Sequence, residues 1–460
     1  MNNSQDAKQE TNTKNQSSSS NIKSSSQRYD ELISFLQQKG FVWGPEPEIY
    51  GGLAGFYTYA PLGKLLKNNV ENEIRKIYTK NGFYEVECPT VMQKEVWEAS
   101  GHLGGFTDPV ITCFKCKSNF RIDTLLKELF GEKLPNEDFD HKSDDEYVSF
   151  IKSNDIKCPS CKNNFNIDSN IEIKRHTLMM KTTIGLDVEA YNRPETATTT
   201  YLPFLRYTDF FRKKFPYGIF QIGKAYRNEI SPRQHVIRCR EFTQAEAQLF
   251  LFKDQKNNFE KYDSIMHDKM PLWSWWMQES HEHPKMMAVH DALEYNCNLG
   301  TADVDTTKRF FKNKAYAWCV NMAYTFFRNI GIPEDKIRLR QHYPDEKAFY
   351  ADDAWDIEVN LNSFGWTELC GVHDRTNYDL TQHAKHSGKK LIALNEQSTA
   401  EEKNEVPNII EIAFGTDRPT FALLDIFYEK LDEKEGKCKF KVPLHMSPIK
   451  VAVFPLQKKD

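Results

Sequence analysis

The residues best suited to chemistry gather in one segment of the chain, between positions 206 and 240. This segment holds nine Lys or Arg residues and two acids, a net charge of +7 (9 − 2), whereas the whole chain has a net charge of −4. A local positive excess of this size favours a polyphosphate ligand. Arginine suits that ligand because its planar guanidinium can hold two phosphate oxygens at once.

Within this segment, the pattern predicts two strands joined by a turn at Ser231-Pro232. Residues two apart on a strand point to the same face, so Glu229 would lie beside Arg227. There Glu229 could accept a hydrogen bond from an adenine amino group, and Phe242 could stack on the ring. The alternative is a charged hairpin held together by cross-strand ion pairs.

The elements that would position these side chains are mixed along the chain. Hydrophobic periodicity predicts helices over 29–39, 62–80, 316–327 and 419–430, and strands over 83–87, 217–222, 355–359, 366–371 and 409–414. Hairpins of strands interrupted by helical segments favour an α+β fold with an antiparallel sheet. The chain contains no glycine-rich phosphate loop, which argues against a Rossmann or P-loop nucleotide site.

The length of 460 residues is more than one ordinary core accommodates. Residues 1–27 are polar and low in complexity, so we expect a disordered tail. We expect insertions at 110–175, which is polar and contains paired cysteines, and at 256–330, which is mainly helical. No apolar run reaches the length of a membrane span, and the absence of a signal peptide or an Arg-rich presequence predicts a cytoplasmic protein.

Four of the ten cysteines form two CxxC pairs, namely Cys113 with Cys116 and Cys158 with Cys161. Each pair places two thiolates on one turn, which is half of a tetrahedral zinc shell. The gap of 41 residues between the pairs is longer than in compact zinc ribbons. We expect a structural Zn²⁺ bound by all four thiolates, and the alternative is free thiols.

The arginine-rich segment, with its Arg-x-Glu, turn and Arg-Glu-Phe, resembles the second signature motif of class II aminoacyl-tRNA synthetases, and specifically the glycyl-tRNA synthetase family. Other strings resemble that family in the same order: Tyr50-Gly51-Gly52-Leu53-Ala54-Gly55, Val96-Trp97-Glu98-Ala99-Ser100-Gly101-His102, Arg193-Pro194-Glu195-Thr196-Ala197, Arg340-Gln341-His342, Gly365-Trp366-Thr367-Glu368, Asp374-Arg375, Tyr378-Asp379-Leu380, and Phe414-Gly415-Thr416-Asp417-Arg418. The resemblance runs from about Phe41 to Asp460. It implies a class II catalytic core over 28–440, with an antiparallel sheet flanked by helices and a Cys-rich insertion.

The resemblance implies ATP-dependent ligation of glycine to tRNA(Gly) through a glycyl-adenylate. In this scheme Arg227 would hold the α-phosphate, Glu229 the adenine amino group and Arg418 the γ-phosphate, Phe242 would stack on adenine, and Arg238 would meet the β/γ end. The expected Mg²⁺ ligands are Glu358 and Glu368. The expected residues around the glycine ammonium are Glu195, Glu246 and Glu411, balanced by Arg375.

Four positions depart from the family pattern: Thr198-Thr199 replace Gln-Gly, and Ile412-Ala413 replace Pro-Ser, whose serine normally contacts the amino acid. These changes leave an alternative open, namely a catalytically weakened or specificity-shifted paralogue that acts as an RNA-binding or accessory protein. Another class II synthetase, such as a seryl or prolyl enzyme, fits the fold but not the quoted strings. The resemblance also implies a homodimer, and it suggests that 441–460 begins a truncated anticodon-binding domain.

Overall fold

The computed structural model describes residues 27–456 except 132, 135–136, 140–141, 166–171, 231, 233, 296–306, 399–402 and 433–436. The predicted tail over 1–27 therefore lies almost wholly outside the described residues. Among those described, nine strands form one sheet in the order β13-β12-β14-β15-β16-β19-β11-β10-β3. Their bounds are β3 (Phe83–Glu85), β10 (Tyr217–Tyr226), β11 (Glu241–Leu251), β12 (Lys269–Trp273), β13 (Lys285–Ala288), β14 (Ile337–Gln341), β15 (Asp353–Leu361), β16 (Gly365–Thr376) and β19 (Asn408–Gly415).

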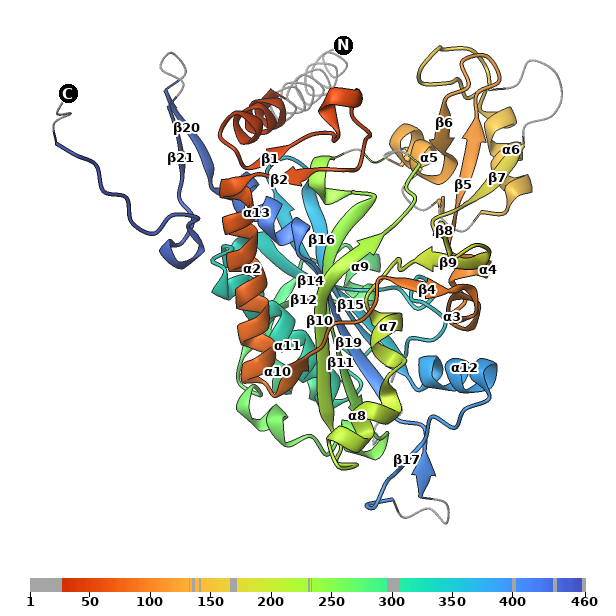
Figure 1. Cartoon of the computed structure of the whole chain (residues 1–460), viewed down its shortest axis with the longest axis vertical. Coiled ribbons are helices and arrows are strands. Elements are labelled where there is room, and N and C mark those ends of the chain that lie inside the picture. Colours follow the sequence, from red (N-terminus) through yellow and green to blue (C-terminus); the bar gives the residue numbers. More distant parts are fainter. Residues whose placement is uncertain are drawn as a thin grey trace, which may run out of the picture.

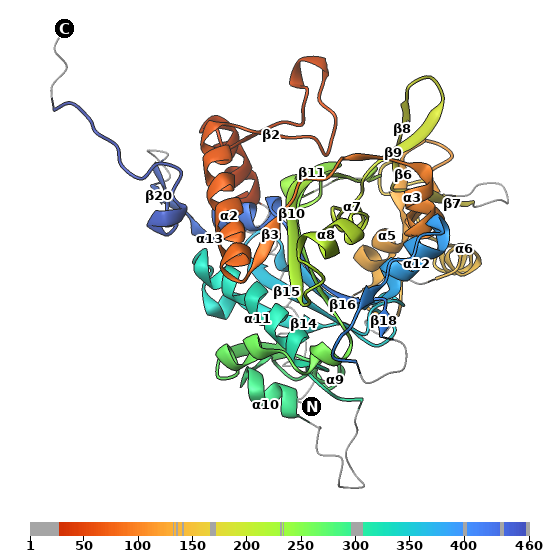
Figure 2. The same ribbon diagram turned by 60° about the horizontal axis from the view of Figure 1, so that its bottom comes forward.

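The centre of this sheet is antiparallel, and parallel pairing occurs only between β3 and β10 and between β12 and β14 among the described strands. Together with the flanking helices in Figures 1 and 2, this arrangement confirms the predicted α+β fold. The range 256–330 also supplies β12 and β13 to the sheet. Neither strand was predicted from the sequence, because both are short and lie among helical segments.

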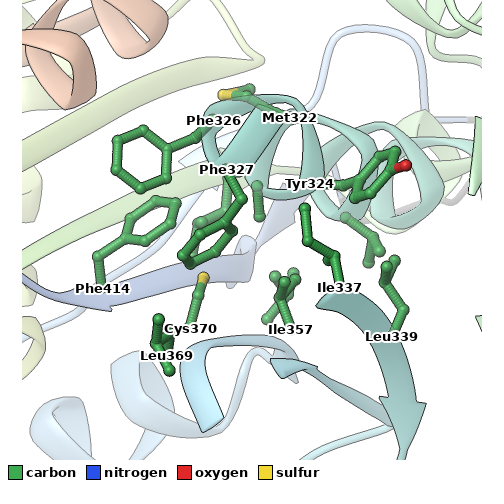
Figure 3. Packing of buried hydrophobic residues seen from close by; sticks show 14 of the residues in the cluster. Met322, Tyr324, Phe326, Phe327, Ile337, Leu339, Ile357, Leu369, Cys370 and Phe414 are labelled. Atoms are coloured by element: carbon green, nitrogen blue, oxygen red, sulfur yellow. The ribbon is translucent and has the colours of Figure 1, made fainter. Parts of the chain in front are cut away.

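One face of the sheet packs against the long helices α2 (Pro61–Lys80), α11 (Lys314–Asn329) and α13 (Asp417–Phe427). The side chains of α11 interlock with alternate residues of the strands, as Figure 3 shows for Phe326 and Phe327 against Phe414. Ring centroids of Phe326 and Phe414 are 4.7 Å apart. Period-two alternation on β19 sends Ile410, Ile412 and Phe414 into this core and leaves Glu411 and Ala413 on the opposite face.

That opposite face is covered only in part by shorter helices, as the view in Figure 2 shows. A second hydrophobic cluster there joins α7 (Ala197–Tyr201), α8 (Phe204–Phe210) and α12 (Tyr378–Ser387) to the ends of β10 and β11. The body also includes α3 (Lys94–Ala99), α4 (His102–Gly105), α9 (Trp275–Glu279) and α10 (Val289–Glu294), and residues 27–38 are helical, which confirms the helix predicted over 29–39. The uncovered part of the face is where polar side chains from β11, β15, β16 and β19 can meet a ligand.

Residues 107–177 form the cysteine-rich unit at the upper right of Figure 1. They include β5 (Thr107–Thr112), β6 (Asn119–Arg121), α5 (Ile122–Phe130), α6 (Asp144–Ser153) and β7 (Ile173–Thr177), with β6, β5 and β7 hydrogen-bonded in that order. Helix α6 begins with a capping box in which Ser143 and Glu146 satisfy each other's backbone N–H groups. A hydrophobic cluster separate from the main core holds this unit together.

Four small sheets complete the fold. They pair β1 (Val42–Trp43) with β2 (Thr58–Tyr59), β4 (Val91–Gln93) with β9 (Val188–Asn192) and β8 (Met180–Ile184), β17 (Ala393–Leu394) with β18 (Asn404–Glu405), and β20 (Tyr428–Asp432) with β21 (Lys437–Phe440). Among the described residues, no helix is both long and apolar enough to cross a membrane.

One expectation about local structure was wrong. The strands around the arginine-rich segment are not joined by a tight turn, because β10 ends at Tyr226 and β11 begins at Glu241, so Arg227 and Glu229 lie in a long loop. The apolar run over 449–454 lies at the surface: Val451, Val453 and Phe454 are 79%, 90% and 83% exposed. Among the described residues, nothing covers this run.

Candidate active site

A cavity of about 620 Å³ opens on the uncovered face of the sheet, between β11, β16, β19, the loop over 227–240 and the start of α13. Its walls include ten of the eleven residues that the sequence predicts for substrate binding: Glu195, Arg227, Glu229, Arg238, Phe242, Glu246, Glu368, Arg375, Glu411 and Arg418. These residues come from segments up to 223 positions apart (418 − 195). Their convergence on one cavity of ligand size makes it the candidate site.

Arg227 stands at one end of this cavity, between two aromatic rings. Its guanidinium carbon lies 5.3 Å from the ring centroids of both Phe106 and Phe242. Its Nε donates to the carbonyl of Pro194 at 3.2 Å, which fixes the side chain and leaves its other nitrogens for a ligand. The loop conformation replaces the strand alternation that the sequence suggested: Arg227 N–H donates to Arg240 O at 2.9 Å, and Glu229 N–H donates back to Arg227 O at 2.7 Å.

Arg418, at the first turn of α13, supplies a second guanidinium to this end. Its Nη1 donates to the carbonyl of Glu368 at 2.7 Å and lies 3.6 Å from the Glu368 carboxylate. A third guanidinium, that of Arg238, pairs with Glu229 through Nε at 3.0 Å. The structure thus brings together the cationic groups that the sequence assigned to one ligand, and this end of the cavity suits a polyanion.

The other end of the cavity contains three carboxylates at close quarters. Glu195, Glu246 and Glu411 come from the segment before α7, from β11 and from β19. Burial, together with the charges of Glu411 and Glu195, raises the pKa of Glu246 to about 8. Thr196 Oγ1 donates to Glu246 at 2.5 Å and only partly offsets this effect. Glu246 therefore carries a proton at neutral pH in the free protein.

The other two carboxylates remain charged. Burial alone would raise the pKa of Glu195, but His102, Arg375 and the Thr198 hydroxyl outweigh it and hold that pKa below its usual value. Burial also opposes ionisation of Glu411, but Arg375 and His373 together outweigh it and lower the pKa of Glu411. Two fixed negative charges and one proton-bearing carboxyl form a site for a small cation.

Arg375 organises this acidic end. Its Nε and Nη2 each donate to Asp379 at 2.8 Å, and its Nη1 lies 3.3 Å from Glu411 Oε1. The guanidinium carbon lies 4.3 Å from the ring centroid of Tyr350. Burial disfavours the charged guanidinium, but Asp379 and Glu411 outweigh it and raise the pKa of Arg375.

Several contacts at this end were not predicted. His102 Nε2 lies 3.5 Å from Glu195 Oε2, and Tyr201 OH donates to Glu411 Oε2 at 3.0 Å. Tyr350 and His373 line the cavity wall. His102 falls within a quoted string and could have been singled out. The two tyrosines and His373 have no signal in the sequence beyond their residue type.

Three of the departures from the family pattern, Thr198, Thr199 and Ala413, have different surroundings. Ala413 lines the cavity and is the register partner of Glu246 across β11 and β19. Thr198 Oγ1 donates to Glu195 Oε1 at 2.6 Å, so it acts on the cavity by fixing that carboxylate. Thr199 instead belongs to a buried hydrogen-bond network, where its Oγ1 accepts from Arg193 at 3.2 Å.

Glu358 is the predicted site residue that does not line the cavity. Its carboxylate pairs with Arg338 at 2.5 Å. Across β15 and β16, however, Glu358 is the register partner of Glu368, next to a bulge. Directly opposed residues in a sheet have Cβ atoms about 4.5–5.5 Å apart, so the two carboxylates can share a ligand if Arg338 releases Glu358.

The four paired cysteines converge in the 107–177 unit as a group that could hold a metal ion. Cys113 Sγ lies 3.6 Å from Cys161 Sγ, and Cys116 Sγ lies 3.6 Å from Cys158 Sγ. With Zn–S bonds of about 2.3 Å, a tetrahedral site separates its sulfur atoms by about 3.8 Å. The thiols are therefore already spaced as a metal would require.

Comparison with known proteins agrees with this geometry. No protein-family model matches the chain. The chain is 41% identical over 419 residues to a glycine–tRNA ligase of Methanococcus maripaludis, covering 89% of this chain and 69% of that protein. It is 34% identical over 511 aligned positions to a glycine–tRNA ligase of Pyrococcus abyssi, covering 94% and 84%. A solved Giardia lamblia prolyl-tRNA synthetase in complex with prolyl-adenylate aligns with a TM-score of 0.51 over 92% of this chain and 56% of its own, at 14% identity, which is a likeness of fold.

Proposed function

Since this chain belongs to the glycine–tRNA ligase family, its reaction is the ATP-dependent attachment of glycine to tRNA, and we propose that the cavity described above activates glycine. The observation that carries the proposal is the polarity of the cavity: three guanidiniums at one end and three carboxylates at the other. One end suits the triphosphate of ATP and the other suits the glycine ammonium. The glycine carboxylate then lies between them, where it can attack.

At the cationic end, we assign the α-phosphate to Arg227, the γ-phosphate to Arg418 and the β/γ end to Arg238. Phe242 and the Arg418 guanidinium would stack on adenine, and Glu229 would accept from its amino group. During the reaction a glycine carboxylate oxygen bonds to the α-phosphorus, and pyrophosphate leaves with the electrons of the broken P–O bond. Fixed cations that hold the phosphate oxygens stabilise the charge that develops there.

At the acidic end, Glu195, Glu246 and Glu411 would surround the ammonium group. Selection for glycine would rest on excluding any substrate side chain larger than hydrogen, which a small pocket does more effectively than weak apolar contacts reject a missing methylene. Arg375 keeps Glu411 ionised and in place. Thr198 does the same for Glu195, so the departure from the family pattern at this position supports the site.

Two metals fit residues of this chain. Glu358 and Glu368 offer neighbouring carboxylates of the kind that Mg²⁺ prefers, and Mg²⁺ bound there with ATP would neutralise phosphate charge. Cys113, Cys116, Cys158 and Cys161 would hold Zn²⁺ in a closed shell of four thiolates, which suits a structural ion.

We further propose a cytoplasmic homodimer that binds tRNA(Gly). Exposed apolar residues support the dimer: Ile49, Tyr50 and Leu53 are 88%, 84% and 54% exposed. Tyr50 and Leu53 belong to the string over 50–55 that resembles the family, and Ile49 directly precedes it. In this scheme 28–440 is the catalytic domain, 110–175 is a zinc-binding insertion, and 441–460 opens an anticodon-binding domain.

The decisive experiment is ATP–pyrophosphate exchange measured with each of the twenty amino acids separately. Glycine alone is expected to support exchange, and a parallel assay is expected to show its transfer to tRNA(Gly). Ala413, which leaves extra room beside Glu246, favours the second candidate, a specificity-shifted paralogue. Exchange with another amino acid would establish that candidate, and absence of exchange with all twenty would overturn the assignment of the cavity.

A further inference from the structure

A second group of metal-ligating side chains lies on the uncovered face of the sheet, away from the cysteines. It comprises His342, just after β14, Asp356 on β15 and His373 on β16. One ligand atom from each residue lies within 4.8 Å of those from the other two. The side chains occur on three neighbouring strands, so the hydrogen-bonded sheet fixes their backbones relative to one another.

Strand register explains why these side chains meet. Trp355 and Ile357 of β15 and Cys370 and Val372 of β16 point into the main core, so Asp356 and His373 point to the opposite face. The register partner of Asp356 is Gly371. A Cβ at Gly371 would lie 2.7 Å from His373 Cε1, 3.4 Å from His373 Nε2 and 3.6 Å from Asp356 Oδ1. Because Gly371 has no side chain, the space above it is open to the ligand atoms of His373 and Asp356.

The two ring nitrogens of His373 have different surroundings. Nδ1 lies 3.4 Å from Glu411 Oε1, whereas Nε2 faces the space above Gly371 beside Asp356. A carboxylate next to one imidazole nitrogen favours the proton there and leaves the other nitrogen free to bind a metal. Carboxylate, histidine and metal in series is a recurrent support for metal ligands.

His342 and Asp356 already touch, with Nε2 2.8 Å from Oδ2. His342 Nδ1 is buried and has no hydrogen-bond partner, so this histidine is not fully satisfied by the protein. A bound cation would take the place of the proton that the pair shares and release it. Ligand atoms on a tetrahedral Zn²⁺ are about 3.3–3.6 Å apart, so His342 Nε2 and Asp356 Oδ2, 2.8 Å apart here, would move apart by about 0.5–0.8 Å to bind one ion.

Charges around the group permit a cation. Arg340 Nη1 lies 3.9 Å from Asp356 Oδ2, but Arg340 is already held by Glu346 through two bonds of 2.9 and 2.8 Å. Glu411 adds a negative charge on the side of His373. The three side chains are only partly exposed, at 17%, 11% and 25% for His342, Asp356 and His373.

From this juxtaposition we propose that His342, Asp356 and His373 form a second metal site, which binds a divalent transition ion such as Zn²⁺. Two imidazoles and one carboxylate are the ligand set of open metal sites, which retain a position for water or substrate. His373 also lines the activation cavity. A divalent ion at His373 would lie close to Glu411 and would weaken the binding of an ammonium group there. This consequence rests on the proposed function, whereas the metal site itself does not.

Metal stoichiometry tests the site directly. Purified full-length protein is dialysed to equilibrium against micromolar ZnCl₂, and the bound zinc is counted by elemental analysis. Wild type is expected to hold two ions per chain, one at the cysteines and one at this site. His373→Asn is expected to hold one, and His283→Ala, which changes an exposed histidine, is expected to hold two. One ion in wild type, or two in His373→Asn, would overturn the proposal.

Further measurements keep the test informative if His373→Asn fails to fold. Co²⁺ added to wild type that holds one equivalent of zinc, at the cysteines, is expected to give the weak visible bands of nitrogen and oxygen ligation without sulfur charge transfer, and absence of these bands would overturn the site. Gly371→Ala retains every ligand but fills the space between them, so it should weaken Zn²⁺ binding at least tenfold.

The effect of zinc on glycine binding is a separate test. Zinc should raise the KM for glycine in wild type and not in His373→Asn. An unchanged KM in zinc-bound wild type would show that the metal does not affect glycine binding, without contradicting the metal site itself.

Discussion

Arg375 and Glu411 form a buried ion pair at the acidic end of the cavity, with Nη1 3.3 Å from Oε1. Both side chains are less than a tenth exposed. Because the guanidinium also binds Asp379 through two nitrogens, it has a fixed position from which to keep Glu411 ionised. With Glu195 and Glu411 both charged, the remaining carboxyl, Glu246, is the one that holds a proton.

Glycine binding should therefore depend on pH through Glu246. The raised pKa of about 8 means that the free protein holds this proton below pH 8, and an arriving ammonium favours the carboxylate. Binding should release about one proton at pH 7, and the KM for glycine should fall about tenfold per pH unit toward 8 and then level. Calorimetry in buffers of different ionisation enthalpy counts the protons.

The matched variant is Glu246→Gln, which keeps the shape of the side chain but cannot titrate. Its KM for glycine should be high and nearly independent of pH between 6 and 8. A wild-type KM that is flat over this range would show that Glu246 is already ionised in the free enzyme.

Arg227→Ala and Arg418→Ala should each abolish activation of glycine without unfolding the protein. Loss of a charge-assisted contact to the transition state costs about 3–4 kcal/mol, a hundredfold or more in rate. Exchange of pyrophosphate into ATP measures the effect, and circular dichroism checks the fold. Arg206→Ala is a suitable control, because Arg206 is an exposed arginine of the same basic segment. A variant that retains more than about a third of wild-type exchange has no such role.

The sequence predicted the long, strongly periodic elements of this fold. Helix α2 was expected over 62–80 and spans Pro61–Lys80, and β15, β16 and β19 all lie where alternation indicated. Each of these elements buries one face against a single core, so its apolar residues recur with the period of a helix or a strand and can be recognised in the sequence. The helix expected over 419–430 ends at Phe427, because Tyr428 turns into β20 to pair with β21. Such pairing depends on a distant partner.

The site was predictable as a set of residues but not as an arrangement. Ten of its members were identified, yet the strand argument for Arg227 and Glu229 was wrong, because the loop over 227–240 is held by its own backbone bonds. The proton on Glu246 results from its burial and from its proximity to Glu411 and Glu195, which together raise its pKa. The spacing of residues along the sequence gives neither the distances between these carboxylates nor their burial, so it cannot predict the pKa of Glu246.

Zinc at the four cysteines should stabilise the 107–177 unit rather than the main sheet. Protein purified without chelators should hold one tightly bound ion, and Cys116→Ser should lose it, whereas Cys438→Ser should keep it. Since the unit has its own hydrophobic cluster, chelation should first increase hydrogen exchange within 107–177. Loss of glycine activation before any such change would place the metal closer to the chemistry than this structure does.

The last prediction concerns the buried pair that joins α2 to the start of α13. Lys67 Nζ lies 2.6 Å from Asp417 Oδ1 and donates to Thr243 Oγ1 at 2.9 Å, while Asp417 Oδ2 accepts from Thr243 N–H at 2.7 Å. Removing one partner leaves an uncompensated buried charge, so Lys67→Met should lower the free energy of unfolding by about 3–5 kcal/mol. Urea unfolding followed by tryptophan fluorescence measures this change.

Two comparisons separate the charge from the packing. Adding Asp417→Asn to Lys67→Met removes the second charge and should recover part of the loss. Lys64→Ala changes a half-exposed lysine of the same helix, 3.5 Å from Glu71, and should cost no more than about 1 kcal/mol. If Lys67→Met is no more destabilising than Lys64→Ala, the pair does not hold α13 in place. The position of Arg418, one residue after Asp417, would then have to be fixed by its own bonds to Ile237 and Glu368.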